Sequence, residues 1–197
     1  MSCPPRFPLS CGAPAKFAVK LGPPLRGIVH SAGVLDDAAL SQQDAARYSR
    51  VFAPKVRGTA LLEALTRSDP LDWMVYFSSI AAVFGSPGQS NHSAANAFLD
   101  ALAREQRLRG LPVSSINWGP WSEVGAAVTH DVSGRLEAQG VGAISPAQGL
   151  LALEHVLAAR AAQVVVLPVD WPRFRARMRG PQLDAFLGSL ARPQSRA

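Results

Sequence analysis

Four polar side chains stand at spacings that would let them do chemistry together: Lys55, Ser79, His92 and Asn96. An ammonium, a hydroxyl, an imidazole and a carboxamide can each donate a hydrogen bond to oxygen, and donors fixed in place stabilise an oxyanion as it develops. His92 and Asn96 are four residues apart, so on one helix their side chains share a face. Each residue alone has an ordinary structural explanation, but their order and spacing together indicate a site.

The elements that must position these residues alternate between strand and helix. The apolar run 25–29 ends in His30-Ser31-Ala32-Gly33, which is typical of a buried strand followed by a glycine loop. Apolar residues at helical spacing over 36–65 predict two helices with a break at Pro54, just before Lys55. Further strands are expected over 73–77, 113–117 and 163–169, and helices over 93–109, 146–160 and 183–190.

This alternation predicts the α/β class, with a parallel sheet covered by helices on both faces. In such sheets, ligands bind at the carboxyl ends of the strands. The loops after Val29, Phe77 and Asn117 are therefore the expected place for the site. Ser79 lies in the second of these loops, thirteen residues before His92.

The composition excludes several functional classes. The 197 residues are 48% hydrophobic and 17% charged, so the chain can bury a core and is not disordered throughout. The net charge of +6 is concentrated in residues 172–197, which hold six arginines against one aspartate, so no nucleic-acid-binding face is expected. No apolar run reaches the roughly 18–20 residues that span a bilayer, and the two cysteines, Cys3 and Cys11, cannot staple a core. We expect a cytoplasmic protein without membrane or nucleic-acid partners and without a metal site.

Three segments are expected along the chain. Residues 1–25 carry six of the sixteen prolines and no periodicity, which favours disorder. Residues 26–175 hold the domain, and residues 176–197 form a basic linker or tail.

Long blocks of residues form a series that resembles a known family. They are His30-Ser31-Ala32-Gly33-Val34-Leu35-Asp36-Asp37, Phe52-Ala53-Pro54-Lys55-Val56-Arg57-Gly58-Thr59, Phe77-Ser78-Ser79, Gly85-Ser86-Pro87-Gly88-Gln89-Ser90-Asn91, Ala94-Ala95-Asn96-Ala97-Phe98-Leu99-Asp100, Ile116-Asn117-Trp118-Gly119-Pro120-Trp121 and Leu167-Pro168-Val169-Asp170-Trp171. This series resembles the ketoreductase domain of modular type I polyketide synthases, within the short-chain dehydrogenase/reductase superfamily. It covers about three quarters of the chain, from Gly27 to Phe174.

The resemblance implies a Rossmann-like doubly wound parallel sheet and a defined reaction. A β-ketoacyl group, held by phosphopantetheine on an acyl carrier protein, would be reduced with NADPH to a β-hydroxyacyl group within a polyketide synthase. Ser79 would hydrogen-bond the substrate carbonyl, and the residue at position 92 would protonate the alkoxide. Lys55 would hold the cofactor ribose and lower the donor's pKa, while Asn96 would help to position this network.

Two loops are implied to line the nicotinamide half of the cofactor site. One is the loop Ser31-Ala32-Gly33, and the other is the turn that contains Asn117 and Gly119. Small residues there let the backbone approach a ligand closely.

The resemblance also implies a stereochemical outcome. Leu35-Asp36-Asp37 matches the fingerprint of ketoreductases that give a D-hydroxyl, and Phe84 stands eight residues before His92, where the opposite class carries Trp. Considered without the family, Asp36 and Asp37 would be a solvated loop with a helix N-cap.

The proton donor departs from the family's pattern, because the family carries Tyr where this chain has His92. Neutral imidazole is a weak acid, and an imidazolium beside the charged Lys55 is disfavoured by like-charge repulsion. Two interpretations stay open: a reductase with an altered donor, or a catalytically silent domain that serves as a scaffold or docking piece.

The start of the fold departs as well. The family opens with βα units whose Gly-rich turn binds the cofactor's pyrophosphate, and residues 1–29 contain no G-x-G-x-x-G. We expect these N-terminal units to be missing, as in a truncated reading frame, so that the chain alone binds NADPH poorly and is inactive.

Overall fold

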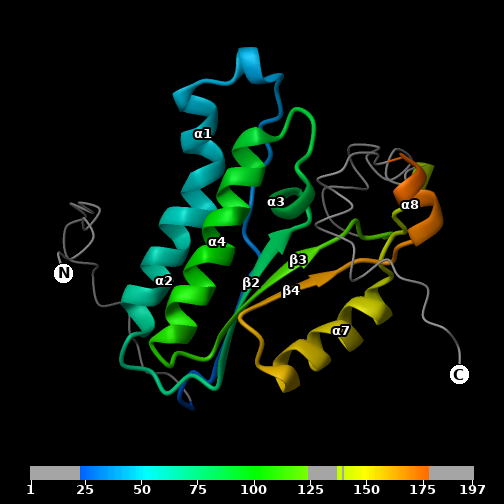
Figure 1. Ribbon diagram of the computed structural model, residues 1–197. Helices are drawn as coiled ribbons and strands as arrows, with labels where there is room; N and C mark the ends of the chain where they lie inside the picture. The colour runs from blue at the N-terminus through cyan, green and yellow to red at the C-terminus, as the bar shows by residue number, and fades with distance from the viewer. Residues whose placement is uncertain (1–22, 124–136, 139, 178–197) are drawn as a thin grey trace, which may run out of the picture.

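The computed structural model describes residues 23–123, 137–138 and 140–177, which contain a four-stranded sheet (Figure 1). Its strands are β1 (Gly27–His30), β2 (Trp73–Ser79), β3 (Val113–Trp118) and β4 (Gln163–Val166), hydrogen-bonded in that order. Every pairing is parallel. The predicted parallel α/β fold is therefore confirmed.

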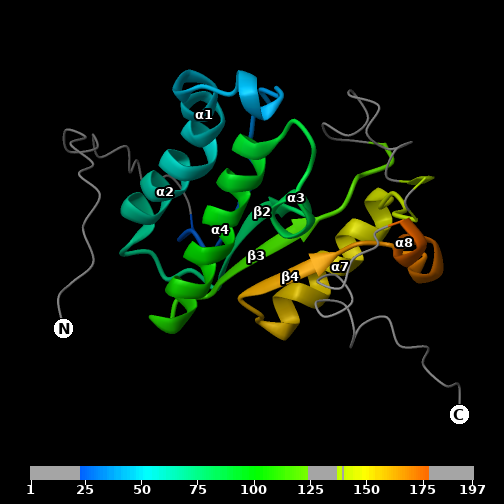
Figure 2. The ribbon, with the colours of Figure 1, turned by 45° about the horizontal axis from the view of Figure 1, so that its top comes forward.

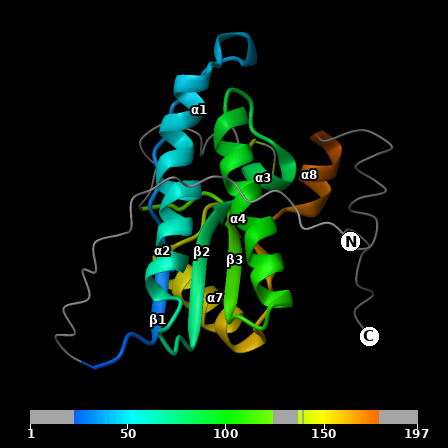
Figure 3. The same cartoon turned by 90° about the vertical axis from the view of Figure 1, so that its left-hand side faces the viewer.

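Helices cover both faces of this sheet. α1 (Ala45–Phe52), α2 (Gly58–Thr66) and α4 (Ser90–Leu108) lie on one face, and α7 (Pro146–Ala159) lies on the other (Figure 1, Figure 3). Figure 2 shows α7 running along β4. The short helices η1 (Leu40–Gln42), α3 (Ala81–Phe84) and α8 (Trp171–Arg177) belong to connections near the carboxyl ends of the strands.

Alternate side chains of β2 enter two separate cores. Met74 and Tyr76 pack with Leu99 of α4. Val75 points the other way and packs with Val156 of α7. A strand buried on both faces needs an almost continuous apolar run, which is why the apolar residues over 73–77 predicted a strand at this place.

The sequence predicts two helices with a break at Pro54, and the structure has two α-helices, α1 and α2, interrupted there by a turn of another kind. The chain runs from α1 through a π-helical segment, η2 (Ala53–Arg57), directly into α2. A proline lacks the backbone N–H and its ring crowds the preceding turn, and a widened turn relieves both conflicts without ending the helix. The widened turn leaves Lys55 buried on the side of the sheet.

Several boundaries differ from those expected. α4 begins at Ser90, three residues before the predicted start, and β4 ends at Val166, before Pro168, which has no N–H to donate to a ladder. The expected disorder over 1–25 lies almost wholly outside the described residues, as do the expected helix over 183–190 and nearly all of the tail. Within the described residues, no helix is both long enough and apolar enough to cross a membrane.

Candidate functional site

Lys55 is bonded to the carboxyl end of β2, the strand whose last residue is Ser79. The Lys55 Nζ donates a hydrogen bond to the backbone oxygen of Phe77 at 2.9 Å, two residues before Ser79. Gly33, in the loop after β1, lies against the same lysine, because a Cβ added there would sit 3.3 Å from the Lys55 Cε. Lys55 therefore lies beside two of the strand ends at which the sequence predicts the site.

The Ser79 hydroxyl is oriented by the chain that follows it. Its oxygen accepts the backbone N–H of Ala81 at 3.1 Å. A hydroxyl has one proton to donate and two lone pairs. The bond to Ala81 uses a lone pair, so the proton is free for an acceptor such as a carbonyl oxygen.

His92 and Asn96 stand on the first two turns of α4. The Asn96 Nδ2 donates to the backbone oxygen of His92 at 2.8 Å. The Asn96 Oδ1 and the His92 Nδ1 are buried and have no hydrogen-bond partner among the described residues. Buried polar atoms are usually satisfied. Four other buried side chains of the described residues also have an atom without a partner, namely Gln43, Ser93, Arg107 and Trp118, so this feature does not by itself locate a ligand.

Burial controls the charges of this site. It lowers the pKa of Lys55 to about 8, although the negative charge of Asp100 opposes this change. Burial, together with the positive charge of Lys55, lowers the pKa of His92 to about 4. At neutral pH, the site therefore holds a largely charged ammonium beside a neutral imidazole.

A buried polar network lies behind Ser79. The Asn117 Nδ2 donates to the backbone oxygen of Ser79 at 3.1 Å, to the Ser78 Oγ at 3.0 Å and to the Asp100 Oδ2 at 2.8 Å. The Asn117 Oδ1 accepts from the Gln163 Nε2 at 2.8 Å. Since the Asn117 side chain is fully buried and bonded at both ends, it ties β2, β3 and α4 together. Its predicted contact with a cofactor stays a prediction.

Gly119 is explained by packing. A Cβ at this position would lie 2.5 Å from the Leu167 Cδ1, and the Gly119 N–H donates to the Val166 oxygen at 2.9 Å. The turn after β3 therefore requires a glycine here to lie beside the end of β4. A role for Gly119 in cofactor binding also stays a prediction.

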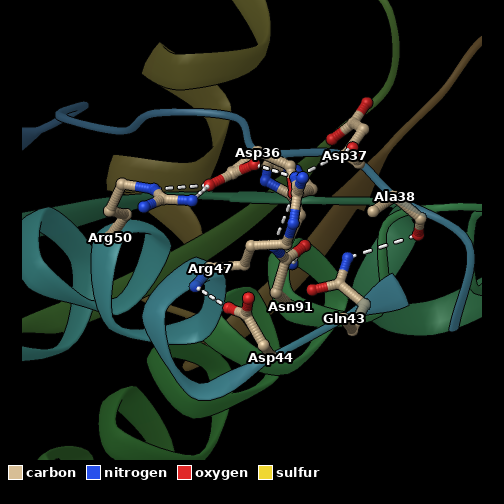
Figure 4. A network of polar contacts seen from close by, with 9 residues as sticks. Asp36, Asp37, Ala38, Gln43, Asp44, Arg47, Arg50 and Asn91 are labelled. Carbon is tan, nitrogen blue, oxygen red and sulfur yellow. Dashed lines mark hydrogen bonds and ion pairs between the residues drawn. The ribbon is translucent and has the colours of Figure 1, made fainter. Parts of the chain in front are cut away.

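The loop that carries Asp36 and Asp37 is anchored to α1, as Figure 4 shows. The Asp36 carboxylate forms ion pairs with Arg47 and Arg50, and only 16% of its side chain is exposed. The residue that caps the N-terminus of α1 is Asp44, which accepts the Arg47 N–H at 2.8 Å. The alternative of a solvated loop with its own helix N-cap is therefore wrong for Asp36.

The same loop is anchored to the start of α4. The Asn91 Nδ2 donates to the backbone oxygen of Asp36 at 2.8 Å, and the Asn91 Oδ1 accepts the backbone N–H of His92 at 2.7 Å. The Gln89 Nε2 donates to the Asp37 carboxylate at 2.9 Å. A single side chain, that of Asn91, thus connects the Asp36 loop to His92.

Asp100 is a residue of this region to which the sequence patterns assigned no role. The residue is 7% exposed, and its carboxylate accepts from the Ser115 Oγ at 2.6 Å as well as from Asn117. One signal was available: His92, Asn96 and Asp100 follow each other at intervals of four, which places them on one helical face. An acidic residue within an apolar stripe needs partners, and here they come from β3.

Comparison with known families gives one clear match. The model of the KR domain family matches residues 13–123 of this chain. A stretch of 153 residues is 42% identical to the polyketide synthase GfsB of Streptomyces halstedii, and 144 residues are 43% identical to the phthioceranic/hydroxyphthioceranic acid synthase of Mycobacterium tuberculosis. These alignments cover 78% and 71% of this chain but only 3% and 7% of those two proteins.

Solved ketoreductase structures share the fold. The structure of A-type ketoreductases from a modular polyketide synthase has a TM-score of 0.74 and 40% identity, covering 80% of this chain and 34% of that one. The first ketoreductase of the tylosin synthase has a TM-score of 0.70 and 36% identity, with 76% and 33% covered. The chain thus spans about a third of the ketoreductase chains that it matches.

Proposed function

Because this chain belongs to the KR domain family, the ketoreductase domains of polyketide synthases, we propose that it is the carbonyl-reducing part of an NADPH-dependent β-ketoacyl reductase. One observation carries the proposal: Lys55 is hydrogen-bonded to the end of β2 that carries Ser79, and the Ser79 hydroxyl keeps its proton free. A charged donor and a free hydroxyl proton suit a carbonyl that becomes an alkoxide.

The residues around Lys55 fit the nicotinamide half of a dinucleotide. An ammonium has three N–H donors, and the Phe77 oxygen occupies one of them, so Lys55 can also hold a ribose hydroxyl. Gly33 lies against Lys55, and the neighbouring Ser31 and Ala32 are exposed, which leaves the loop open to a ligand. When bound, NADPH supplies the hydride. The described residues offer no counterpart of the Gly-rich turn that binds the pyrophosphate in the family.

The chain's own residues act on the carbonyl oxygen. Ser79 donates its hydroxyl proton in a hydrogen bond to that oxygen, and the nearby positive charge of Lys55 stabilises the negative charge that develops there. Asn96 holds the backbone of His92 through its amide, which keeps the first turn of α4 in place. His92 is the residue at the position of the proton donor.

A second candidate, a silent domain, is favoured by the state of His92. With a pKa of about 4, the imidazole is neutral at pH 7, and neutral imidazole is a far weaker acid than a phenol. In this alternative, the domain keeps its fold and serves the synthase by packing or by docking a carrier protein, without reducing anything.

For an active domain, we propose a carrier-protein substrate and a D-hydroxyl product. The β-ketoacyl group would be attached through phosphopantetheine to an acyl carrier protein, since the relatives are large polyketide synthases. The stereochemical proposal rests on Leu35-Asp36-Asp37 and on Phe84. Overall similarity does not carry it, because the similar solved ketoreductases include both A-type and C2-type domains.

The test combines cofactor binding with reduction. The purified chain is titrated with NADPH by calorimetry. NADPH oxidation with a β-ketoacyl thioester is then followed at saturation in a chimera, in which residues 27–171 replace the corresponding segment of a solved ketoreductase. An active reductase oxidises NADPH and gives one hydroxyl enantiomer, which chiral chromatography identifies, while Ser79→Ala abolishes the reaction without changing NADPH affinity. Binding without oxidation supports the silent alternative, and an L-hydroxyl product contradicts the stereochemical proposal.

A further inference from the structure

Asp100 is a buried carboxylate that the proposed reaction does not use directly. It lies on α4, eight residues after His92 and four after Asn96. Its two oxygens accept from Ser115 at 2.6 Å and from Asn117 at 2.8 Å. Within the described part of the chain, no lysine or arginine nitrogen lies within 4.0 Å of it. An ionised carboxylate buried without a cation in contact is costly, so its presence calls for a reason.

The hydrogen bonds of Asp100 lead to the functional end of β2. Asn117, which donates to Asp100, also donates to the backbone oxygen of Ser79 at 3.1 Å. Lys55 donates to the backbone oxygen of Phe77, two residues earlier on the same strand. Lys55 is thus bonded directly to the end of β2, and Asp100 is linked to the same strand end through Asn117.

Asp100 differs in the sign of its charge from the other titratable groups that interact with Lys55. The titratable groups that interact with the ammonium are His30 from β1, and His92 and Asp100 from α4. Neither histidine can compensate the ammonium, because an imidazole is either neutral or positively charged. Asp100 is the group whose negative charge favours the charged form of Lys55.

We propose that Asp100 is a positioning residue of the site, which fixes the end of β2 through Asn117 and acts on the Lys55 ammonium as a buried negative charge. Its importance for reduction rests on the proposed function. Its effect on Lys55 does not, because the charge of Lys55 can be measured in the absence of cofactor and substrate.

The test is an NMR titration of the lysine side chains in the 197-residue chain. The sequence contains three lysines, Lys16, Lys20 and Lys55, so labelling with ¹³C-lysine gives few resonances, and Lys55→Met assigns the third. In the wild type, Lys55 is expected to titrate near pH 8, where burial holds its pKa. In Asp100→Asn, the pKa of Lys55 is expected to fall by about one unit or more, because the compensating charge is lost from a buried site.

Ser115→Ala is the matched control. It removes one hydrogen bond to Asp100 but keeps the charge, so the domain should lose stability while the pKa of Lys55 stays within about 0.3 units of the wild type. In Asp100→Asn, the new amide group can meet the Asn117 amide donor to donor, and this conflict could prevent folding. If it does, the variant Asn117→Ser is compared with the double variant D100N/N117S instead. In that pair, the conflict is removed and only the charge differs.

The outcomes separate the two proposals. A lower Lys55 pKa in the charge-neutral variant supports the role of Asp100, whether or not the chain reduces a ketone. An unchanged Lys55 pKa, or an equal fall in Ser115→Ala, overturns it even if the chain proves to be an active ketoreductase.

Discussion

The substitution His92→Tyr is expected to raise the rate of ketone reduction at pH 7 by roughly a hundredfold or more. Burial and the charge of Lys55 lower the pKa of His92 to about 4, so about one molecule in a thousand carries the imidazolium at pH 7. A phenol with a pKa near 10 is almost wholly in its acid form at that pH. The substitution therefore restores a proton donor in nearly every molecule.

The local structure should survive this substitution. His92 is held by two hydrogen bonds that use its backbone: its N–H donates to the Asn91 Oδ1 at 2.7 Å, and its carbonyl oxygen accepts from the Asn96 Nδ2 at 2.8 Å. Neither bond involves the imidazole. The His92 Nδ1 has no partner among the described residues, so no hydrogen bond from that atom is lost.

The assay measures NADPH oxidation with a β-ketoacyl thioester, at saturating cofactor and substrate. His92→Phe is the matched control, because it has the ring of tyrosine without the hydroxyl. So that weak cofactor binding does not limit the rate, the same three sequences are also tested in a chimera. In it, residues 27–171 replace the corresponding segment of a solved ketoreductase, which supplies the remaining two thirds of the domain.

Two results would refute this reasoning. If His92→Tyr is no faster than His92→Phe while both bind NADPH equally, proton donation from position 92 does not limit the reaction. If the wild type is already active, and its rate rises about tenfold for each pH unit between 7 and 5, the imidazolium is a working donor and the domain is not silent.

Three further perturbations have defined outcomes. Between pH 4 and 6.5, the unfolded chain binds a proton at His92 that the folded chain excludes, so the free energy of unfolding falls as the pH falls. His92→Gln has no such proton to bind. In urea unfolding, its free energy should therefore fall less across this window than that of the wild type, by up to about 3 kcal/mol. Asp36→Asn removes the ion pairs with two arginines of α1 and should lower the unfolding free energy by about 1–2 kcal/mol, less at high salt, and an unchanged value would mean that the loop is held by its backbone bonds alone. Gly33→Ala places a methyl group 3.3 Å from the Lys55 Cε and should weaken NADPH binding about three- to tenfold with a stability change below about 1 kcal/mol, and calorimetry showing undiminished affinity would argue against this loop as part of the cofactor site.

The sequence was sufficient to predict the sheet and most of the helices, because those signals are local. The apolar run from Trp73 to Phe77 must be buried on both faces, and β2 has one core on each side. Pro54 shows the limit of local rules. A proline disfavours an α-helical turn, but packing of α1 and α2 along one face of the sheet is maintained by a π-helical turn in its place.

The four candidate residues could be named from the sequence, since their order matches one family. The structure places Ser79 at the end of β2, Lys55 against that strand, and His92 and Asn96 on α4, while their roles in a site stay predictions. The protonation states of these residues could not be predicted from the sequence. The pKa of His92 depends on how deeply its ring is buried beside Lys55, and burial is a property of the packed chain.

Only the tertiary structure decided which groups hold the site in place. The backbone oxygen of Asp36 is bonded by Asn91, 55 residues away in the sequence, and the Asp100 carboxylate finds its donors on β3. Hydrogen bonds require partners within about 3 Å and in the right direction, and no periodicity along a chain specifies such distances between remote residues. Residue types and spacing therefore determined what could react, and packing decided what is charged, what is fixed and what remains free to bind.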